Sequence, residues 1–258
     1  MTEAFYLPLG EDRFLPTKHT VGPWSADSQH MGPPTALLTR AMQRCAPREE
    51  LRLARVTVEI LGPVPVAELQ VRARVERPGR AVELVSAEIL AAGRPVARAA
   101  GWRLATNDTS SVTGGLAEPM ESLDTARQIF APEGWVDGYL GAMEWFAVRG
   151  SFAEPGPAAS WVRQRVALVD GEEPDGLQRL MVVADSGNGL SNRLDIRRWL
   201  FINTELSVHI LREPTGEWIG LDAATAIGPN GMGTASSVLH DQLGQVGRGA
   251  QELLIRPR

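Results

Sequence analysis

Apolar and polar residues alternate along four segments in the first 105 residues of the chain. A period of two places apolar side chains on one face of a β-strand, so each segment predicts a strand. Upstream, residues 30–46 carry apolar residues at helical spacing, and Pro33 and Pro34 suit the first turn of a helix. The order predicts an α+β unit in which a curved antiparallel sheet wraps one helix. The alternating segments are residues 55–61, 68–77, 81–93 and 95–104.

The second half of the chain repeats this plan. A strand at 160–169 precedes an apolar helix at 174–192, and four alternating segments follow. With one gap between the two copies, residues 96–100 align with 246–250, which places Gly101 opposite Gln251. A repeat about 150 residues apart predicts a duplicated domain. Only the second copy carries the candidate polar residues. The last four segments are residues 200–212, 216–228, 233–241 and 247–257.

The repeat predicts two units and a connector. We expect an N-terminal unit at 1–105, a connector at 106–158, and a C-terminal unit at 159–258 that carries the active site. The connector is polar at first and then rich in aromatic residues, and we expect it to cover the ends of both sheets. These aromatic residues are Phe130, Trp135, Tyr139, Trp145 and Phe146.

Composition narrows the classes of function. The chain has 258 residues, of which 43% are hydrophobic, and a net charge of −5, which argues against nucleic acid or an anionic membrane as partner. The single Cys45 excludes an internal disulfide and fits a reducing cytoplasm. No secretory signal and no run of 18 apolar residues is present, so we expect a cytoplasmic protein. The four histidines lack metal-ligand spacing, and no cofactor motif or nucleophile elbow occurs.

Asp185 is the first candidate for chemistry. It ends the apolar stretch of the second helix, where a buried carboxylate is costly unless it is paired or used. One reading is a cap for the Asp-Ser-Gly-Asn-Gly turn that follows. The other is a general base or a carboxylate that orients water.

Three further polar residues are candidates. Continuous alternation through 202–210 would place Asn203 on a polar face and Thr204 on the apolar one. Gln251 is an uncharged amide where the first copy has Gly101, although it could equally be a surface residue. His30 directly precedes the first helix. It is a candidate for a base, a substrate contact or a helix cap.

The chain resembles the acyl-CoA thioesterase II family of double hot-dog proteins. The resemblance rests on HMGPP before the first helix, ADSGNGLSN on the second, and the order FINTELSVH, GEWIGLD, GRGAQELLIRP. It implies an α+β double hot-dog fold: two antiparallel sheets, each wrapping a central helix, joined into one pseudo-dimeric sheet.

The resemblance also implies a mechanism, in which a hydrogen-bonded Asp, Thr and Gln hold the water that attacks an acyl-CoA or acyl-carrier thioester. These positions fall on Asp185, Asn203 with Thr204 beside it, and Gln251. Asn in place of Thr departs from the family pattern, and we favour Asn203 because it shares the polar face.

Further features of the substrate site follow from the same resemblance. The acyl chain would lie between helix and sheet near Leu180 and Met181, and arginines would meet the phosphates of coenzyme A. No cofactor is implied, and a homodimer or higher homo-oligomer is left open. The expected substrate contacts are His30, Gly32, Met181 and Ser186.

Two other functions stay open. A hot-dog hydratase or dehydratase needs a His paired with an Asp, and His30 is the candidate near the first helix. A non-catalytic thioester-binding or assembly protein would fit the Asn at the Thr position. Turnover separates the enzyme from the binding protein.

Overall fold

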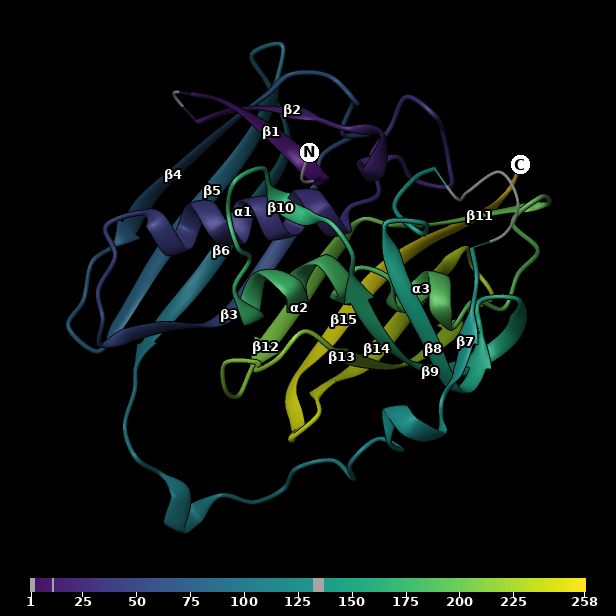
Figure 1. Ribbon diagram of the computed structural model, residues 1–258. Coiled ribbons are helices and arrows are strands. Elements are labelled where there is room, and N and C mark those ends of the chain that lie inside the picture. The colour runs from purple at the N-terminus through teal and green to yellow at the C-terminus, as the bar shows by residue number, and fades with distance from the viewer. Residues whose placement is uncertain (1–2, 11, 132–136) are drawn as a thin grey trace.

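One large curved sheet surrounds two central helices (Figure 1). The computed structural model describes residues 3–10, 12–131 and 137–258. In those residues the strand order is β10-β1-β2-β4-β5-β6-β3-β12-β15-β14-β13-β9-β8-β7, and β11 pairs with β15. Strands β1 and β10 run parallel, and the other pairs are antiparallel.

The elements of the first half are β1 (Ala4–Gly10), β2 (Arg13–Pro16), the 3-10 helix η1 (Lys18–Thr20), α1 (Gly32–Arg44), β3 (Leu51–Ile60), β4 (Leu69–Arg77), β5 (Val82–Ala91) and β6 (Arg94–Ala105). The middle of the chain holds η2 (Ser110–Val112), η3 (Leu123–Thr125), β7 (Arg127–Ile129), β8 (Met143–Ser151), β9 (Glu154–Gln164) and β10 (Ala167–Val169). The last part holds α2 (Gly176–Ala184), α3 (Gly187–Leu190), β11 (Trp199–Asn203), β12 (Glu205–Ile210), β13 (Ile219–Ile227), β14 (Met232–Asp241) and β15 (Gly244–Pro257).

The strand pairing confirms the duplication and the double hot-dog fold. Strands β4-β5-β6-β3 of the first half have the same order as β13-β14-β15-β12 of the second. The two sets join where Thr57 of β3 faces Ser207 of β12, residues that are 150 apart in sequence. The hairpin closed by Ala91 and Arg94 has its counterpart at Asp241 and Gly244, also 150 residues on.

Two strands occupy the last part of the predicted connector. Residues 143–158 belong to β8 and β9, which take the place beside β13 that β1 and β2 take beside β4. We therefore propose that the second unit begins near residue 143. Residues 107–116 swing away from the body of the molecule (Figure 1), and the chain returns to it where the backbone N–H of Ala117 donates to Gln245 Oε1 at 2.7 Å. Trp135 lies outside the described residues.

The two helices form the centre of the core. Helix α1 begins at Gly32 with Pro33 and Pro34 in its first turn, as predicted. Helix α2 is buried on nearly all sides. The helices run antiparallel, because Gln43 at the end of α1 bonds to Asp175 at the start of α2. No helix in the described residues is long and apolar enough to cross a membrane.

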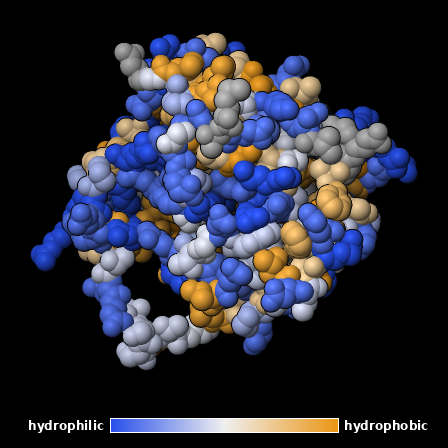
Figure 2. Space-filling view, in the orientation of Figure 1, coloured by the Kyte–Doolittle hydropathy of each residue, from blue (hydrophilic) through white to orange (hydrophobic). Residues whose placement is uncertain are grey.

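Much of the face in Figure 2 is hydrophilic, and apolar atoms form separate orange groups on it. One of these groups lies at the top of the view, where Figure 1 places β1 and β2. The exposed leucines Leu7, Leu9 and Leu15 belong to these two strands.

Two predicted elements are broken in the structure. The helix expected at 174–192 is interrupted at Asp185 and Ser186, between α2 and α3. The strand expected at 200–212 is interrupted at Thr204, and the buried positions change there from odd-numbered to even-numbered residues. The expectation that alternation continues through 202–210 and places Asn203 on the polar face is therefore wrong.

Candidate active site

Asp185 is a buried carboxylate at the C-terminal end of α2. Only 4% of the residue is exposed. Asn203 Nδ2 donates to its Oδ1 at 2.8 Å, and Gln251 Nε2 lies 3.4 Å from the same oxygen. In the described residues these partners are distant in sequence, so the carboxylate does not cap the turn that follows it. Burial raises the pKa of Asp185 to about 7, although hydrogen bonds from Asn203, Gln251, Gly32 and Met31 act in the opposite direction.

Gln251 fixes the backbone around Asp185. Its Nε2 donates to the backbone carbonyl of Asp185 at 3.0 Å, and its Oε1 accepts the backbone N–H of Asn188 at 2.9 Å. Both ends of the amide are therefore occupied, and Gln251 does not line the cavity described below. It ties the interruption between α2 and α3 to strand β15.

His30 lies against the other carboxylate oxygen. Its Nδ1 is 3.3 Å from Asp185 Oδ2 and accepts the backbone N–H of Gly32 at 3.0 Å. Burial lowers the pKa of His30 to about 3, so the imidazole is neutral at physiological pH. Because Nδ1 accepts a hydrogen bond from Gly32, the ring proton of the neutral form is on Nε2. In the described residues Nε2 has no hydrogen-bond partner.

Tyr139 and Ser186 support the imidazole. The ring of Tyr139 stacks on His30 with centroids 3.7 Å apart and an interplanar angle of 6°. Its hydroxyl donates to the carbonyl of Val182 at 2.9 Å, so Ser186 Oγ, 2.8 Å away, donates to the tyrosine. No sequence pattern pointed to a role for Tyr139, which we expected in the connector. Ser186, which the sequence predicts to contact substrate, lines the cavity described below, and its hydroxyl proton is donated to Tyr139.

Gly32 allows the two helices to meet at the site. A Cβ atom here would collide with the carbonyl oxygen of Val182 in α2 and would lie 3.2 Å from both His30 Nδ1 and the Tyr139 ring. The start of α1 can thus approach the end of α2 only without a side chain. The positive N-terminal end of α1 then faces Asp185.

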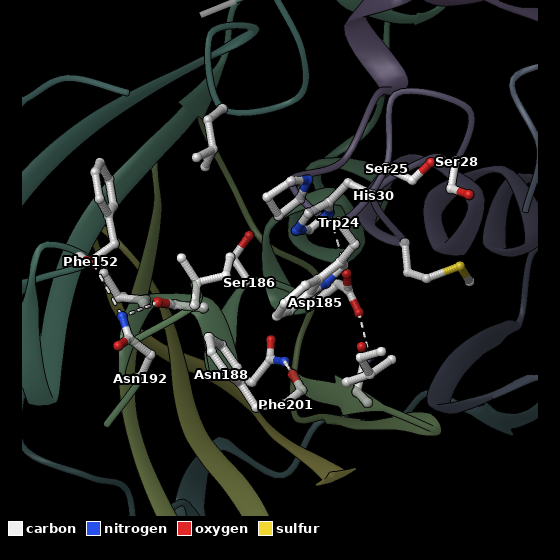
Figure 3. Close-up of a pocket in the computed structure, with 18 of the residues that line it drawn as sticks. Trp24, Ser25, Ser28, His30, Phe152, Asp185, Ser186, Asn188, Asn192 and Phe201 are labelled. Carbon is white, nitrogen blue, oxygen red and sulfur yellow. Dashed lines mark hydrogen bonds and ion pairs between the residues drawn. The ribbon is translucent and has the colours of Figure 1, made fainter. Parts of the chain in front are cut away.

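A cavity of about 760 Å³ opens beside these residues, and His30, Asp185, Ser186 and Asn203 line it. Figure 3 shows His30 and Asp185 facing each other in the middle of the cavity, with Phe152 and Asn192 at one side. Residues of both halves of the chain line it. Apolar side chains form much of the wall: Trp24, Leu61, Val64, Leu140, Trp145, Phe152, Leu190, Leu194, Ile196 and Phe201.

Three expected residues lie outside the reacting region. Leu180 and Met181 are fully buried in the core and do not line the cavity. The apolar lining of the cavity comes instead from the residues described above. Thr204 lines the cavity edge but is exposed, and its Oγ1 has only a long 3.4 Å contact with the Glu252 carbonyl. Within the described residues no cluster of metal-ligating side chains is present.

Comparison with protein families gives two matches. The family described as "Acyl-CoA thioesterase N-terminal domain" matches residues 20–104, and the one described as "Acyl-CoA thioesterase C-terminal domain" matches residues 120–255. The second match alone covers more than half of the chain. Among curated proteins none matches the sequence.

Solved structures show the same fold over nearly the whole chain. A hot-dog protein of unknown function from Alicyclobacillus acidocaldarius has a TM-score of 0.78 at 15% identity, covering 98% of this chain and 97% of its own. A provisionally named thioesterase II from Thermobifida fusca YX has a TM-score of 0.75 at 18% identity, covering 99% and 98%. The acyl-CoA thioesterase II TesB2 of Mycobacterium marinum has a TM-score of 0.65 at 11% identity, covering 98% and 95%.

Proposed function

We propose that this chain, which belongs to the acyl-CoA thioesterase family, hydrolyses acyl thioesters by direct attack of water on the thioester carbonyl. The observation that carries the proposal is the placement of Asp185. One of its carboxylate oxygens is fixed by Asn203 and Gln251, and the residue lines a largely apolar cavity. A buried carboxylate with a pKa of about 7 is suited to general base catalysis at neutral pH.

Asp185 acts as the base in this mechanism. Its Oδ2 takes a proton from water as the water oxygen bonds to the carbonyl carbon, which gives a tetrahedral intermediate with a negative oxygen. The carbon–sulfur bond then breaks, and Asp185 returns the proton to the departing thiolate. The products are a carboxylic acid and a free thiol, and no covalent acyl-enzyme is required.

The other polar groups have separate roles. Asn203 Nδ2 holds Asp185, which leaves Asn203 Oδ1 to accept the second hydrogen of the attacking water. His30 carries its proton on Nε2 and lines the cavity, so it donates to the negative oxygen of the intermediate. Gln251, whose amide is fully occupied, is a positioning residue rather than a water ligand.

Thiol release tests the proposal. A panel of acyl-CoAs from short to long chains is offered to the wild type, to Asp185→Ala and to Asp124→Asn, a control at an exposed residue of η3. We expect turnover by the wild type and the control, and a loss of about 100-fold or more in Asp185→Ala. As pH increases towards about 7, kcat/KM should rise about tenfold per pH unit, because Asp185 must be deprotonated to act as the base.

Absence of turnover by the wild type on every chain length would overturn hydrolysis and favour a thioester-binding protein. Full activity in Asp185→Ala, with the fold intact by circular dichroism, would remove Asp185 from the mechanism.

A second candidate function rests on the contact between His30 and Asp185. A hydratase or dehydratase uses such a pair to move a proton beside the thioester carbonyl, and the two side chains here are 3.3 Å apart. Loss of the conjugated double bond of an enoyl-CoA, followed by its ultraviolet absorbance, would detect that reaction. Thiol release without this change supports the hydrolase.

A further inference from the structure

The cavity has two unlike ends, on opposite sides of Asp185. Figure 3 shows Phe152 well to one side of Asp185, and Ser25 and Ser28 to the other. Ser25 is exposed, so its end of the cavity meets solvent. The other end leads into the protein, because Trp145, which lines it beside Phe152, is only 2% exposed. An alkyl chain gains the most free energy where it leaves water completely, which is the second end.

Three residues form this inner end, and each holds the next. The ring of Phe152 packs edge-to-face on Trp145, with centroids 5.8 Å apart and an interplanar angle of 87°. The indole Nε1 of Trp145 donates to the carbonyl of Leu140 at 3.3 Å. All three residues line the cavity, and we refer to them as the apolar end: Leu140, Trp145 and Phe152. The position of the Phe152 ring therefore determines how far this end extends.

Phe152 is fixed although it lies in a surface turn. It follows the last residue of β8 and precedes β9, and it is half-buried while Ala153 and Glu154 beside it are exposed. Asn192 Nδ2 donates to the Phe152 carbonyl at 3.1 Å, and the backbone N–H of Gly156 donates to the Asn192 carbonyl at 2.8 Å. These two bonds tie the turn to the segment that follows α3. The ring therefore points inward from a backbone that is held on both sides.

We propose that Phe152 sets the upper limit on the length of the acyl chain, because its ring ends the cavity where the tip of the chain lies. The inference rests on the proposed thioester hydrolysis. The substrates are then thioesters of apolar acyl groups, up to the length at which the tip meets the Phe152 ring. Each methylene that enters the apolar end should raise kcat/KM about fourfold. A methylene beyond the limit must displace the ring or bend the chain, which costs more than its burial returns.

The test measures kcat/KM for a series of acyl-CoAs of increasing chain length, in the wild type, Phe152→Ala and Phe152→Trp. We expect the preferred length to increase in Phe152→Ala and to decrease in Phe152→Trp. For the first chain beyond the wild-type limit, kcat/KM in Phe152→Ala should exceed the wild-type value by about tenfold or more. For the shortest chains, which do not reach the ring, all three proteins should be equally active.

Phe146→Ala is the matched control. Phe146 lies in β8, one residue from Trp145, and packs edge-to-face on Trp218 with centroids 5.3 Å apart. Neither of these two partners is among the described residues that line the cavity. The control loses the same aromatic ring from the same strand, and its preferred chain length should equal that of the wild type.

Two results would overturn the role of Phe152. One is the same preferred length in wild type and Phe152→Ala, and the other is an equal loss of kcat/KM at every length in a folded variant. If Phe152→Ala fails to fold, Phe152→Leu removes less volume and should give a smaller shift in the same direction.

Calorimetric titration with thioether analogues of the same acyl-CoAs, which cannot be hydrolysed, separates this inference from the proposed function. A wild type that hydrolyses none of the thioesters, but binds the analogues with a length limit that Phe152→Ala extends, would refute the proposed function alone. A wild type that hydrolyses the thioesters with a length limit that no Phe152 variant moves would refute the inference alone.

Discussion

At the residue scale, His30 and Asp185 hold one proton between them. Folding gives a protonated Asp185, with a pKa of about 7, beside a neutral His30, with a pKa of about 3. In the unfolded chain between about pH 4 and pH 6.5, the aspartate is ionised and the histidine is protonated. Both states then carry one proton on this pair. The pair therefore contributes little slope to the pH dependence of stability in that range.

Single substitutions should reveal the opposing contributions of His30 and Asp185 to the pH dependence of stability. In Asp185→Asn, His30 alone remains, with a depressed folded pKa. The stability of this variant relative to wild type should fall as pH decreases from about 6.5 towards 4. In His30→Gln, Asp185 alone remains, with a raised folded pKa, so relative stability should fall as pH rises from about 4 to 7.

Each slope is at most about 1.4 kcal/mol per pH unit. Urea unfolding of the three proteins across this range measures them. Taking differences from the wild type removes the contributions of other ionisable groups. Parallel curves for all three proteins would contradict the shared proton.

At the scale of secondary-structure elements, two interruptions assemble the site. The break between α2 and α3 leaves Asp185 at a helix end, where its side chain reaches the sheet. The break at Thr204 reverses the alternation, so Asn203 turns inward while Thr204 turns outward. Without this reversal, either Asn203 or the buried positions Leu206 and Val208 would face solvent.

Alanine substitutions at the two neighbouring positions should therefore differ sharply. Asn203→Ala removes a hydrogen bond to a buried carboxylate, and we expect it to lower stability by about 1–3 kcal/mol and to lower kcat. Thr204→Ala removes only the long contact with Glu252, and stability should change by less than about 0.5 kcal/mol with kcat unchanged. Urea unfolding and thiol release measure both effects. If Thr204→Ala proved the more damaging of the two for kcat, Thr204 rather than Asn203 would be the residue that acts on water.

The sequence predicts regular elements well and their interruptions poorly. Periods of two and of 3.6 follow from which face is buried, so α1 and the strands of both halves could be predicted. The register of the repeat also predicts the equivalence of Gly101 and Gln251. Tyr139 and the inward turn of Asn203 depend on contacts between segments far apart in sequence, and local periodicity carries no record of these.

At the scale of the whole molecule, duplication creates two places where the start of one helix meets the end of the other. At the first, Gly32 of α1 meets the end of α2, and the cavity opens there. At the second, the start of α2 meets the end of α1, and Arg40 donates two hydrogen bonds to Glu172 while Gln43 bonds to Asp175. The ion pair holds the pKa of Glu172 below its usual range.

The strands show the same asymmetry. Gln251 in the second half anchors the backbone of Asp185, whereas its counterpart Gly101 leaves space that Leu53 and Met42 fill: a Cβ atom at Gly101 would lie 2.6 Å from Leu53 and 3.1 Å from Met42. The second meeting place is thus closed by an ion pair and apolar packing. We infer that it serves stability and that each chain has one active site.

Stoichiometry tests this asymmetry directly. A thioether analogue of acyl-CoA, which cannot be hydrolysed, should bind with one site per chain in a calorimetric titration. Glu172→Gln should leave that stoichiometry and kcat unchanged while lowering stability by about 1–3 kcal/mol, because it weakens charged hydrogen bonds to the nearly buried Arg40. Asp185→Asn should show the reverse pattern, with kcat lost and the fold retained. Two sites per chain, or a loss of kcat in Glu172→Gln without loss of structure, would mean that the second meeting place is also functional.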